Sequence, residues 1–249
     1  MTLQDPRTSE LADRLAAVHR RIDSAAATAA GAKPTLIVVT KFHPAADVLR
    51  LRSLGVADVG ENRDQEAAAK ALEVSDAELR WHFIGQLQTN KAKSVAAYAH
   101  SVHSIDRASL VTSLGRAMNA RQQENGRANL ECFIQVDLSG AYPELSAVEP
   151  TGRGGRGGVA PSNIEELADL IAGTGGLELA GLMAVAPLGV APEPAFDLLA
   201  RASAALLAQH PQATGFSAGM SQDLEAAIAV GATHLRVGSD ILGPRPPVL

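Results

Sequence analysis

Short apolar segments alternate with longer segments of helical periodicity along almost the whole chain. The chain opens on a helical pattern, in which apolar residues recur from Leu11 to Ile22 with charged residues between them. Thr8 or Ser9 is the expected N-cap, because a hydroxyl oxygen there can accept a hydrogen bond from the first turn. We therefore predict an amphipathic N-terminal helix.

Eight of the apolar segments have the length and composition of β-strands. They are residues 35–40, 58–60, 81–85, 101–105, 131–138, 177–185, 214–219 and 234–239. Helical patterns lie between them, and strict alternation of strand and helix requires a parallel sheet covered by helices. We predict an α/β fold, a single (β/α)8 TIM-type barrel formed by residues 1–249. The alternative is a doubly wound open sheet.

Length and charge narrow the class of protein further. The 249 residues match what one such barrel needs, and a net charge of −5 lacks the basic excess that nucleic-acid binding requires. The single cysteine, Cys132, excludes an internal disulfide and is expected in the core. No secretory signal opens the chain, and no apolar run approaches the roughly 20 residues of a membrane span. We predict a soluble, cytoplasmic protein without a membrane partner.

Residues 139–163 break the alternation, because they are rich in glycine and proline and carry no periodicity. We predict a mobile loop here. The functional interpretation is a lid over a pocket, with Arg153 and Arg156 attracting anions. A G-x-G-x-x-G spacing occurs inside the segment, but it does not follow directly on a strand and prolines flank it, so we reject a dinucleotide site.

Lys41 stands at the end of the first predicted strand, and in either fold the active site belongs at the carboxyl ends of the strands. One interpretation is structural: the side chain lies along apolar surface and its ammonium reaches water. The other is chemical: a partly desolvated lysine of lowered basicity attacks a carbonyl group. The position of Lys41 alone does not choose between them.

Two segments near the end of the chain combine hydroxyl groups with glycines. The first holds Ser217, Gly219 and Ser221 between a strand and a helix, and the second holds Gly238 and Ser239 after the last strand. In a closed barrel the loops after the seventh and eighth strands are neighbours and recurrently bind phosphate. We predict a phosphate site there, and capping of the next helix by Ser221 is the simpler alternative.

A lysine and a phosphate site at one barrel mouth imply a phosphorylated carbonyl ligand, either pyridoxal 5′-phosphate (PLP) or a phosphosugar. Arg236 lies on the last strand, from which it could reach a heteroaromatic nitrogen of a ring anchored by its phosphate. A phosphate counter-ion or a rim salt bridge is the alternative. An arginine at that nitrogen would disfavour its protonation and leave the ring a weaker electron sink.

Other residues of the same rim are candidate ligand contacts. Glu61 and Asn62 follow the second predicted strand, where they bind the ligand or cap the next helix. His82, in the third strand, is a candidate cofactor contact, and its side chain is either a base or a satisfied core histidine. Met183 is expected in the core or in the pocket wall.

Seven segments stand out in order between about residues 36 and 245: VVTKFHPAADV, GENRDQE, WHFIGQLQTNK, VHSIDR, GLMAV, FSAGMSQDLEAAI and RVGSDILG. They resemble the successive motifs of the pyridoxal phosphate homeostasis protein family. The resemblance implies a barrel similar to the N-terminal domain of alanine racemase, with PLP held as a Schiff base on Lys41. It also implies a carrier and regulator of vitamin B6 supply without established turnover.

The same resemblance assigns the remaining cofactor contacts. Ser217 or Ser221 would hold the phosphate with the amides of Gly238 and Ser239, and Arg236 would face the pyridine nitrogen. The chain departs from its relatives in two places. Residues 139–163 lack a lysine that many relatives carry there, and Asp240 stands where a small uncharged residue is usual. If Asp240 points inward, its carboxylate should weaken phosphate binding.

Four functions remain open at this stage. A PLP-dependent racemase needs a second base, which alanine racemase takes from an additional domain, and neither Tyr98 nor Tyr142 is an obvious substitute. A Schiff-base aldolase of phosphosugars needs the same lysine and phosphate site. We favour a PLP carrier that is not an enzyme, is a monomer, uses no metal, and has PLP-dependent apoenzymes as candidate acceptors. For a simple interaction protein, neither Lys41 nor Arg236 would matter.

Overall fold

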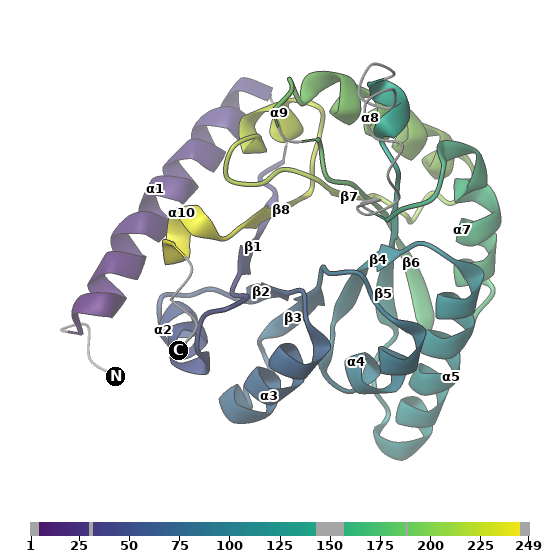
Figure 1. The fold of residues 1–249 in the computed structure, drawn as a ribbon, viewed down its shortest axis with the longest axis horizontal. Helices are drawn as coiled ribbons and strands as arrows, with labels where there is room; N and C mark the ends of the chain where they lie inside the picture. The colour runs from purple at the N-terminus through teal and green to yellow at the C-terminus, as the bar shows by residue number, and fades with distance from the viewer. Residues whose placement is uncertain (1–4, 30–31, 143–156, 188, 245–249) are drawn as a thin grey trace.

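A computed structural model describes residues 5–29, 32–142, 157–187 and 189–244 of the protein. Its centre is a closed barrel of parallel strands in sequence order (Figure 1). The strands are β1 (Thr35–Val39), β2 (Asp58–Glu61), β3 (Arg80–Phe83), β4 (Ser101–Ile105), β5 (Leu130–Gln135), β6 (Leu177–Met183), β7 (Gly215–Ser217) and β8 (His234–Val237). The predicted (β/α)8 barrel is confirmed, and the open-sheet alternative is excluded because β1 pairs with β8.

Helices surround the barrel and connect successive strands (Figure 1). They are α1 (Pro6–Ala29), α2 (Ala45–Ser53), α3 (Asp64–Val74), α4 (Ala92–Tyr98), α5 (Ala108–Asn125), α7 (Ile164–Ala172), α8 (Glu193–Gln209), α9 (Leu224–Ala229) and α10 (Ser239–Leu242). Short 3-10 turns, η1 (Thr89–Lys91), η2 (Ser139–Ala141) and η3 (Pro161–Asn163), complete the connections.

The N-terminal helix begins earlier than the sequence pattern predicted. Helix α1 starts at Pro6, and Asp5 caps it by accepting a hydrogen bond from the amide of Arg7 at 3.3 Å. Thr8 and Ser9 already lie within the helix, so their prediction as N-caps is wrong. The reason is that proline suits the first helical position and an aspartate before it is a strong cap.

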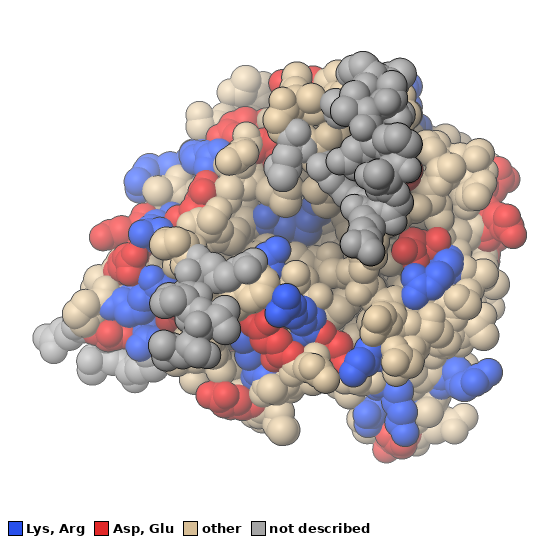
Figure 2. Space-filling model, viewed as in Figure 1, with Lys and Arg blue, Asp and Glu red and all other residues tan. Residues whose placement is uncertain are grey.

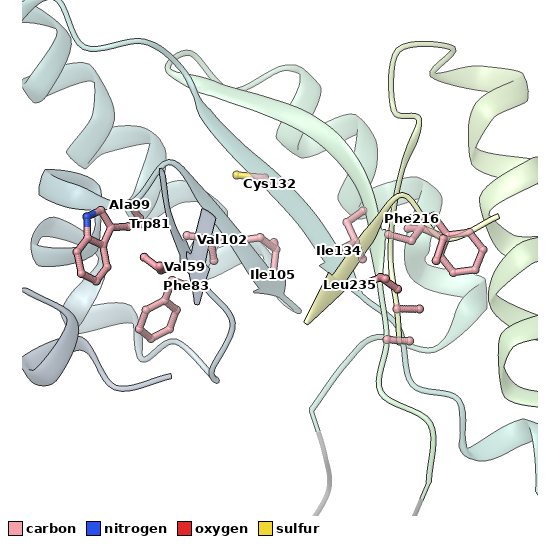
Figure 3. Close-up of a cluster of buried hydrophobic side chains, with 14 of the residues drawn as sticks. Val59, Trp81, Phe83, Ala99, Val102, Ile105, Cys132, Ile134, Phe216 and Leu235 are labelled. Atoms are coloured by element: carbon pink, nitrogen blue, oxygen red, sulfur yellow. The ribbon is translucent and has the colours of Figure 1, made fainter. Parts of the chain in front are cut away.

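Side chains on the strands form two layers. One layer faces the helices and joins a single apolar cluster, of which Val59, Val102, Ile134 and Leu235 are shown in Figure 3. The other layer consists of alternate positions, because successive side chains of a strand point to opposite faces. It fills the barrel with polar and aromatic groups, among them His82, His103, Phe133, Ser217 and Arg236. The functional groups of the strands therefore lie inside the barrel and at its mouth.

Candidate functional site

Lys41 lies just past the carboxyl end of β1, as the sequence predicted, with Thr40 between it and the strand. It is half-buried, and its Nζ lies 5.9 Å from the centroid of the Phe42 ring. Phe42 has a φ of +69°, which is uncommon for a residue with a side chain. The turn that presents Lys41 is therefore held in an unusual backbone conformation.

A second lysine, which sequence reasoning missed, holds this turn from behind. Lys70 of α3 is buried, and its Nζ donates to the carbonyl of Thr40 at 2.9 Å, to Glu61 Oε1 at 2.7 Å and to Glu66 Oε1 at 2.6 Å. Glu66 also accepts a hydrogen bond from the amide of Phe42 at 2.5 Å. All three donors of the ammonium are used, so Lys70 is structural.

Two buried acceptors lie at the carboxyl end of β2, the neighbour of β1. Glu61 Oε2 and Asn62 Oδ1 are shielded from solvent and have no hydrogen-bond partner within the described part of the chain. Burial raises the pKa of Glu61. Because buried acceptors without a donor are costly, these two oxygens are candidates to accept a hydrogen bond from a polar ligand.

Arg236 enters the barrel from β8 and is only 4% exposed. Its Nη1 donates to Ser217 Oγ at 2.5 Å and its Nη2 to the carbonyl of Ala184 at 2.7 Å. Burial lowers the pKa of Arg236 to about 10, so the guanidinium stays charged at neutral pH. The predicted rim salt bridge is not what holds Arg236, since both of these acceptors are neutral.

A chain of hydrogen bonds runs from Ser217 across the barrel interior. His103 Nδ1 lies 2.9 Å from Ser217 Oγ, and its Nε2 lies 2.9 Å from Ser101 Oγ. Ser101 Oγ is 2.6 Å from Nδ1 of His82, whose Nε2 is 2.8 Å from Asp58 Oδ1. Burial lowers the pKa of both histidines, so each is a neutral ring with one donor and one acceptor.

One set of hydrogen positions satisfies the whole chain. Asp58 is a carboxylate whose pKa is held low by His82 and Arg80 against the effect of burial, so it accepts from His82. Ser101 then donates to His82, and His103 donates to Ser101. Ser217 accepts from Arg236 and donates to His103, which leaves its hydroxyl without a hydrogen for a phosphate. Of the two serines predicted for the phosphate, this arrangement favours Ser221.

The predicted cofactor contact of His82 remains a prediction. Both of its ring nitrogens have protein partners, which fits the alternative of a satisfied core histidine. Met183 ends β6, is 1% exposed and pairs with Ser217 of β7. Its role as a pocket wall also remains a prediction.

The two predicted phosphate segments do come together. Ser221 Oγ lies 3.2 Å from Ser239 Oγ, which joins the loop after β7 to the start of α10 after β8. Close packing fixes both loops, because a Cβ at Gly219 would lie 2.8 Å from Leu235 Cδ2, and one at Gly238 would lie 3.0 Å from the carbonyl oxygen of Val39.

The capping role considered for Ser221 is wrong. Helix α9 begins at Leu224, and its N-cap residue is Asp223, which accepts a hydrogen bond from the amide of Met220 at 2.6 Å.

Asp240, which the sequence placed near the proposed phosphate site, forms an ion pair with Arg21 of α1 at 2.7 Å. Its carboxylate therefore has a cationic partner on the helix outside the barrel.

The two tyrosines considered as a second base are both engaged in hydrogen bonds, and only part of the predicted 139–163 loop is described. Tyr98 is a donor to Asp64 at 3.4 Å, and Tyr142 donates to the carbonyl of Ala191 at 2.5 Å. Residues 139–142 and 157–163 are described, whereas the rest of the predicted lid, with Arg153 and Arg156, lies outside the described residues.

The face of the molecule in Figure 2 is hollowed near its centre, and lysine and arginine side chains lie in and around the hollow.

Within the described part of the chain, no group of three or more His, Cys, Asp or Glu residues could hold a metal ion. None of the helices described there combines the length and apolar character of a membrane span.

The fold and the site define a class of barrels that the alanine racemase N-terminal domain typifies, and the sequence model of that domain family matches residues 14–246. The pyridoxal phosphate homeostasis protein of Mycobacterium tuberculosis is 42% identical over 253 residues, which cover 96% of this chain and 94% of the relative. That of Corynebacterium glutamicum is 44% identical over 213 residues, 85% and 90% of the two chains. The chain belongs to the pyridoxal phosphate homeostasis protein family.

Solved structures agree with this assignment. PipY of Synechococcus elongatus, solved with PLP bound, is 30% identical with a TM-score of 0.76, and the match covers 94% of this chain and 100% of PipY. Alanine racemase from Corynebacterium glutamicum is 12% identical with a TM-score of 0.65, over 94% of this chain and 60% of the racemase. The second likeness shows the shared fold alone.

Proposed function

We propose that this protein binds PLP and serves vitamin B6 homeostasis as a carrier, with residues 1–249 acting as one cofactor-binding unit. The observation that carries the proposal is the placement of Lys41 at the mouth of the same barrel that holds Arg236 and the Ser221–Ser239 pair. The relatives named as PLP homeostasis proteins and the PLP-bound PipY support it.

The residues present fit this cofactor. PLP supplies an aldehyde, and Lys41 is the amine that would join it as a Schiff base, since Lys70 is fully engaged in three hydrogen bonds. Ser221, Ser239 and the amide of Gly238 would hold the phosphate. Asn62 Oδ1, which has no partner among the described residues, offers an acceptor to the cofactor.

Arg236 would face the pyridine nitrogen in this proposal. A guanidinium with a pKa of about 10 remains a donor at neutral pH and disfavours a proton on a ring nitrogen opposite it. Such a ring withdraws electrons less strongly than one that faces a carboxylate. The expectation of little or no racemisation rests on the second base, because the engaged hydroxyls of Tyr98 and Tyr142 are not evident candidates for it.

The remaining parts of the proposal concern the setting. We place the protein in the cytoplasm as a monomer, with PLP-dependent apoenzymes as acceptors. The free, buried thiol of Cys132 is consistent with a reducing compartment.

The test is an absorbance titration of the purified protein with PLP. The Schiff-base band should form in the wild type, vanish in Lys41→Ala, and persist in Lys93→Ala, which removes an exposed lysine of α4. A phosphosugar aldolase would instead be colourless until given its substrate. Robust racemisation of alanine or serine by the pure protein would contradict the carrier proposal.

A further inference from the structure

Helix α1 is fastened to both loops of the proposed phosphate site by one side chain. Arg21 binds Glu225 of α9 through two nitrogens, Nε at 2.8 Å and Nη2 at 3.0 Å. Its Nη2 also donates to the carbonyl of Ser221 at 2.8 Å, and its Nη1 donates to Asp240 Oδ2 at 2.7 Å. One planar guanidinium thus spans the loop after β7 and the start of α10.

The two loops that Arg21 joins are the ones whose hydroxyls meet. Ser221 Oγ and Ser239 Oγ lie 3.2 Å apart, and Arg21 binds Ser221 itself and the residue that follows Ser239. A second arginine of α1 holds the far end of α10, because Arg7 Nη2 donates to the carbonyl of Leu242 at 2.9 Å. Figure 1 shows α1 lying alongside α10 and α9.

The contact between Arg21 and Asp240 also compensates the negative charge of the Asp240 carboxylate. Asp240 follows Ser239 in the sequence, and its side chain is 33% exposed. A carboxylate close to a bound phosphate would repel it, whereas an ion pair at 2.7 Å offsets that negative charge and directs the side chain toward α1. Arg21 therefore does two things, since it fixes the loops and compensates Asp240.

We propose that Arg21 is a positioning residue for phosphate recognition, which sets the spacing of the Ser221 and Ser239 loops and keeps the Asp240 carboxylate directed away from the ligand. The inference rests on the proposed function, because the phosphate is that of PLP. Arg21 itself acts from outside the barrel, through Ser221 and Asp240.

The test compares PLP with pyridoxal, which has the aldehyde but lacks the phosphate. Arg21→Ala should weaken PLP binding by about tenfold, an effect of the size expected for coupled charged neighbours. It should leave pyridoxal binding to Lys41 unchanged. Arg20→Ala, which removes an exposed arginine of the same helix, should change neither affinity.

A second variant tests the role of the charge. In Arg21→Ala/Asp240→Asn the repelling carboxylate is gone, so PLP affinity should rise above that of Arg21→Ala. Equal losses of PLP and pyridoxal binding, or an Arg21→Ala affinity for PLP that matches Arg20→Ala, would overturn the inference. Absence of Lys41-dependent binding of either compound in the wild type would instead refute the proposed function.

Discussion

At the scale of single residues, the two lysines near the barrel mouth differ in what surrounds their ammonium groups. Lys70 has an acceptor for each of its three donors, two of them on carboxylates. Lys41 is half-buried, with the Phe42 ring near its Nζ. Lys70 constrains the chain on both sides of Lys41, directly at the Thr40 carbonyl and, through Glu66, at the Phe42 amide. Lys70 therefore positions the turn that carries Lys41.

Replacing Lys70 tests this division of roles. Lys70→Met removes the cation that faces Glu61 and Glu66 while keeping most of the apolar stem. Breaking a buried pair leaves an uncompensated charge, so we expect the free energy of unfolding to fall by about 3–5 kcal/mol. Chemical denaturation measures it, and Lys93→Ala should stay within about 0.5 kcal/mol of the wild type. A wild-type value for Lys70→Met would refute the structural role.

Sequence reasoning identified Lys41 but not Lys70, and the difference has a physical cause. Lys41 interrupts an apolar segment at a strand end, which is visible in one dimension. Lys70 follows Glu66 at a spacing of four in a helical pattern, which is ordinary for a solvent-exposed pair. Its burial depends on how α3 packs beside β1 and β2. The spacing was the available signal, but it did not distinguish a buried pair from a surface pair.

At the scale of elements, close approach between backbone segments positions the loops at the barrel mouth, as side-chain hydrogen bonds also do. Gly85 follows β3 at the point where the chain passes Asn62, and a Cβ there would lie 2.2 Å from the Asn62 carbonyl oxygen. The glycine of the WHFIGQLQTNK segment is thus required by the neighbouring loop. It allows Asn62 to stand at the end of β2, where its side-chain oxygen is buried.

We predict that Gly85→Ala destabilises the protein by about 1–3 kcal/mol, the usual cost of inserting a methyl group into packed structure. The shift of Asn62 that relieves the clash should also weaken PLP binding. Gly140→Ala is the matched control, because nothing lies within 4 Å of its added Cβ. Thermal unfolding of both variants checks the expectation, which fails if they melt alike.

The order of elements was predictable because most strands carry a compact apolar pattern, and 101–105 matches β4 in both bounds. Other boundaries depend on tertiary pairing. The prediction 131–138 extends beyond β5, which ends at Gln135. Beyond that residue the pairing is reduced to an isolated bridge between Val136 and Val159. The contact between Arg21 and Asp240 joins residues from opposite ends of the chain, so no local pattern could reveal it.

At the scale of the whole molecule, a chain of polar side chains runs through the barrel interior from one end of the barrel to the other. The chain of hydrogen bonds starts at Arg80, passes Asp58 and the buried histidines, and ends at Arg236. Since every group in it has a partner, the chain stabilises one arrangement of Arg236. It also ties the stability of the barrel to the neutrality of its histidines.

Acid should therefore destabilise the protein. Burial lowers the pKa of His234 to about 4, whereas an unfolded histidine titrates near 6.5. Between pH 4 and pH 6.5 the unfolded chain binds a proton at His234 that the folded chain does not. The contribution of neutral His234 to the free energy of unfolding is therefore fully present above about pH 6.5 and is lost as the pH drops toward 4. The slope is at most about 1.4 kcal/mol per pH unit for each such histidine.

Urea unfolding at several pH values checks this expectation. The wild type should lose stability from pH 6.5 downward, and His234→Asn should lose less over the same interval because one titrating group is gone. Parallel pH profiles for the two proteins would show that His234 is not held neutral in the fold.

The central claim is a covalent bond between Lys41 and the aldehyde carbon of PLP, and borohydride reduction followed by peptide mass mapping tests it most directly. We predict a pyridoxyl group on the peptide that contains Lys41, with Lys70 unmodified. A reduced adduct on Lys70, or a Lys41 peptide that stays unmodified at saturating PLP, would contradict the account.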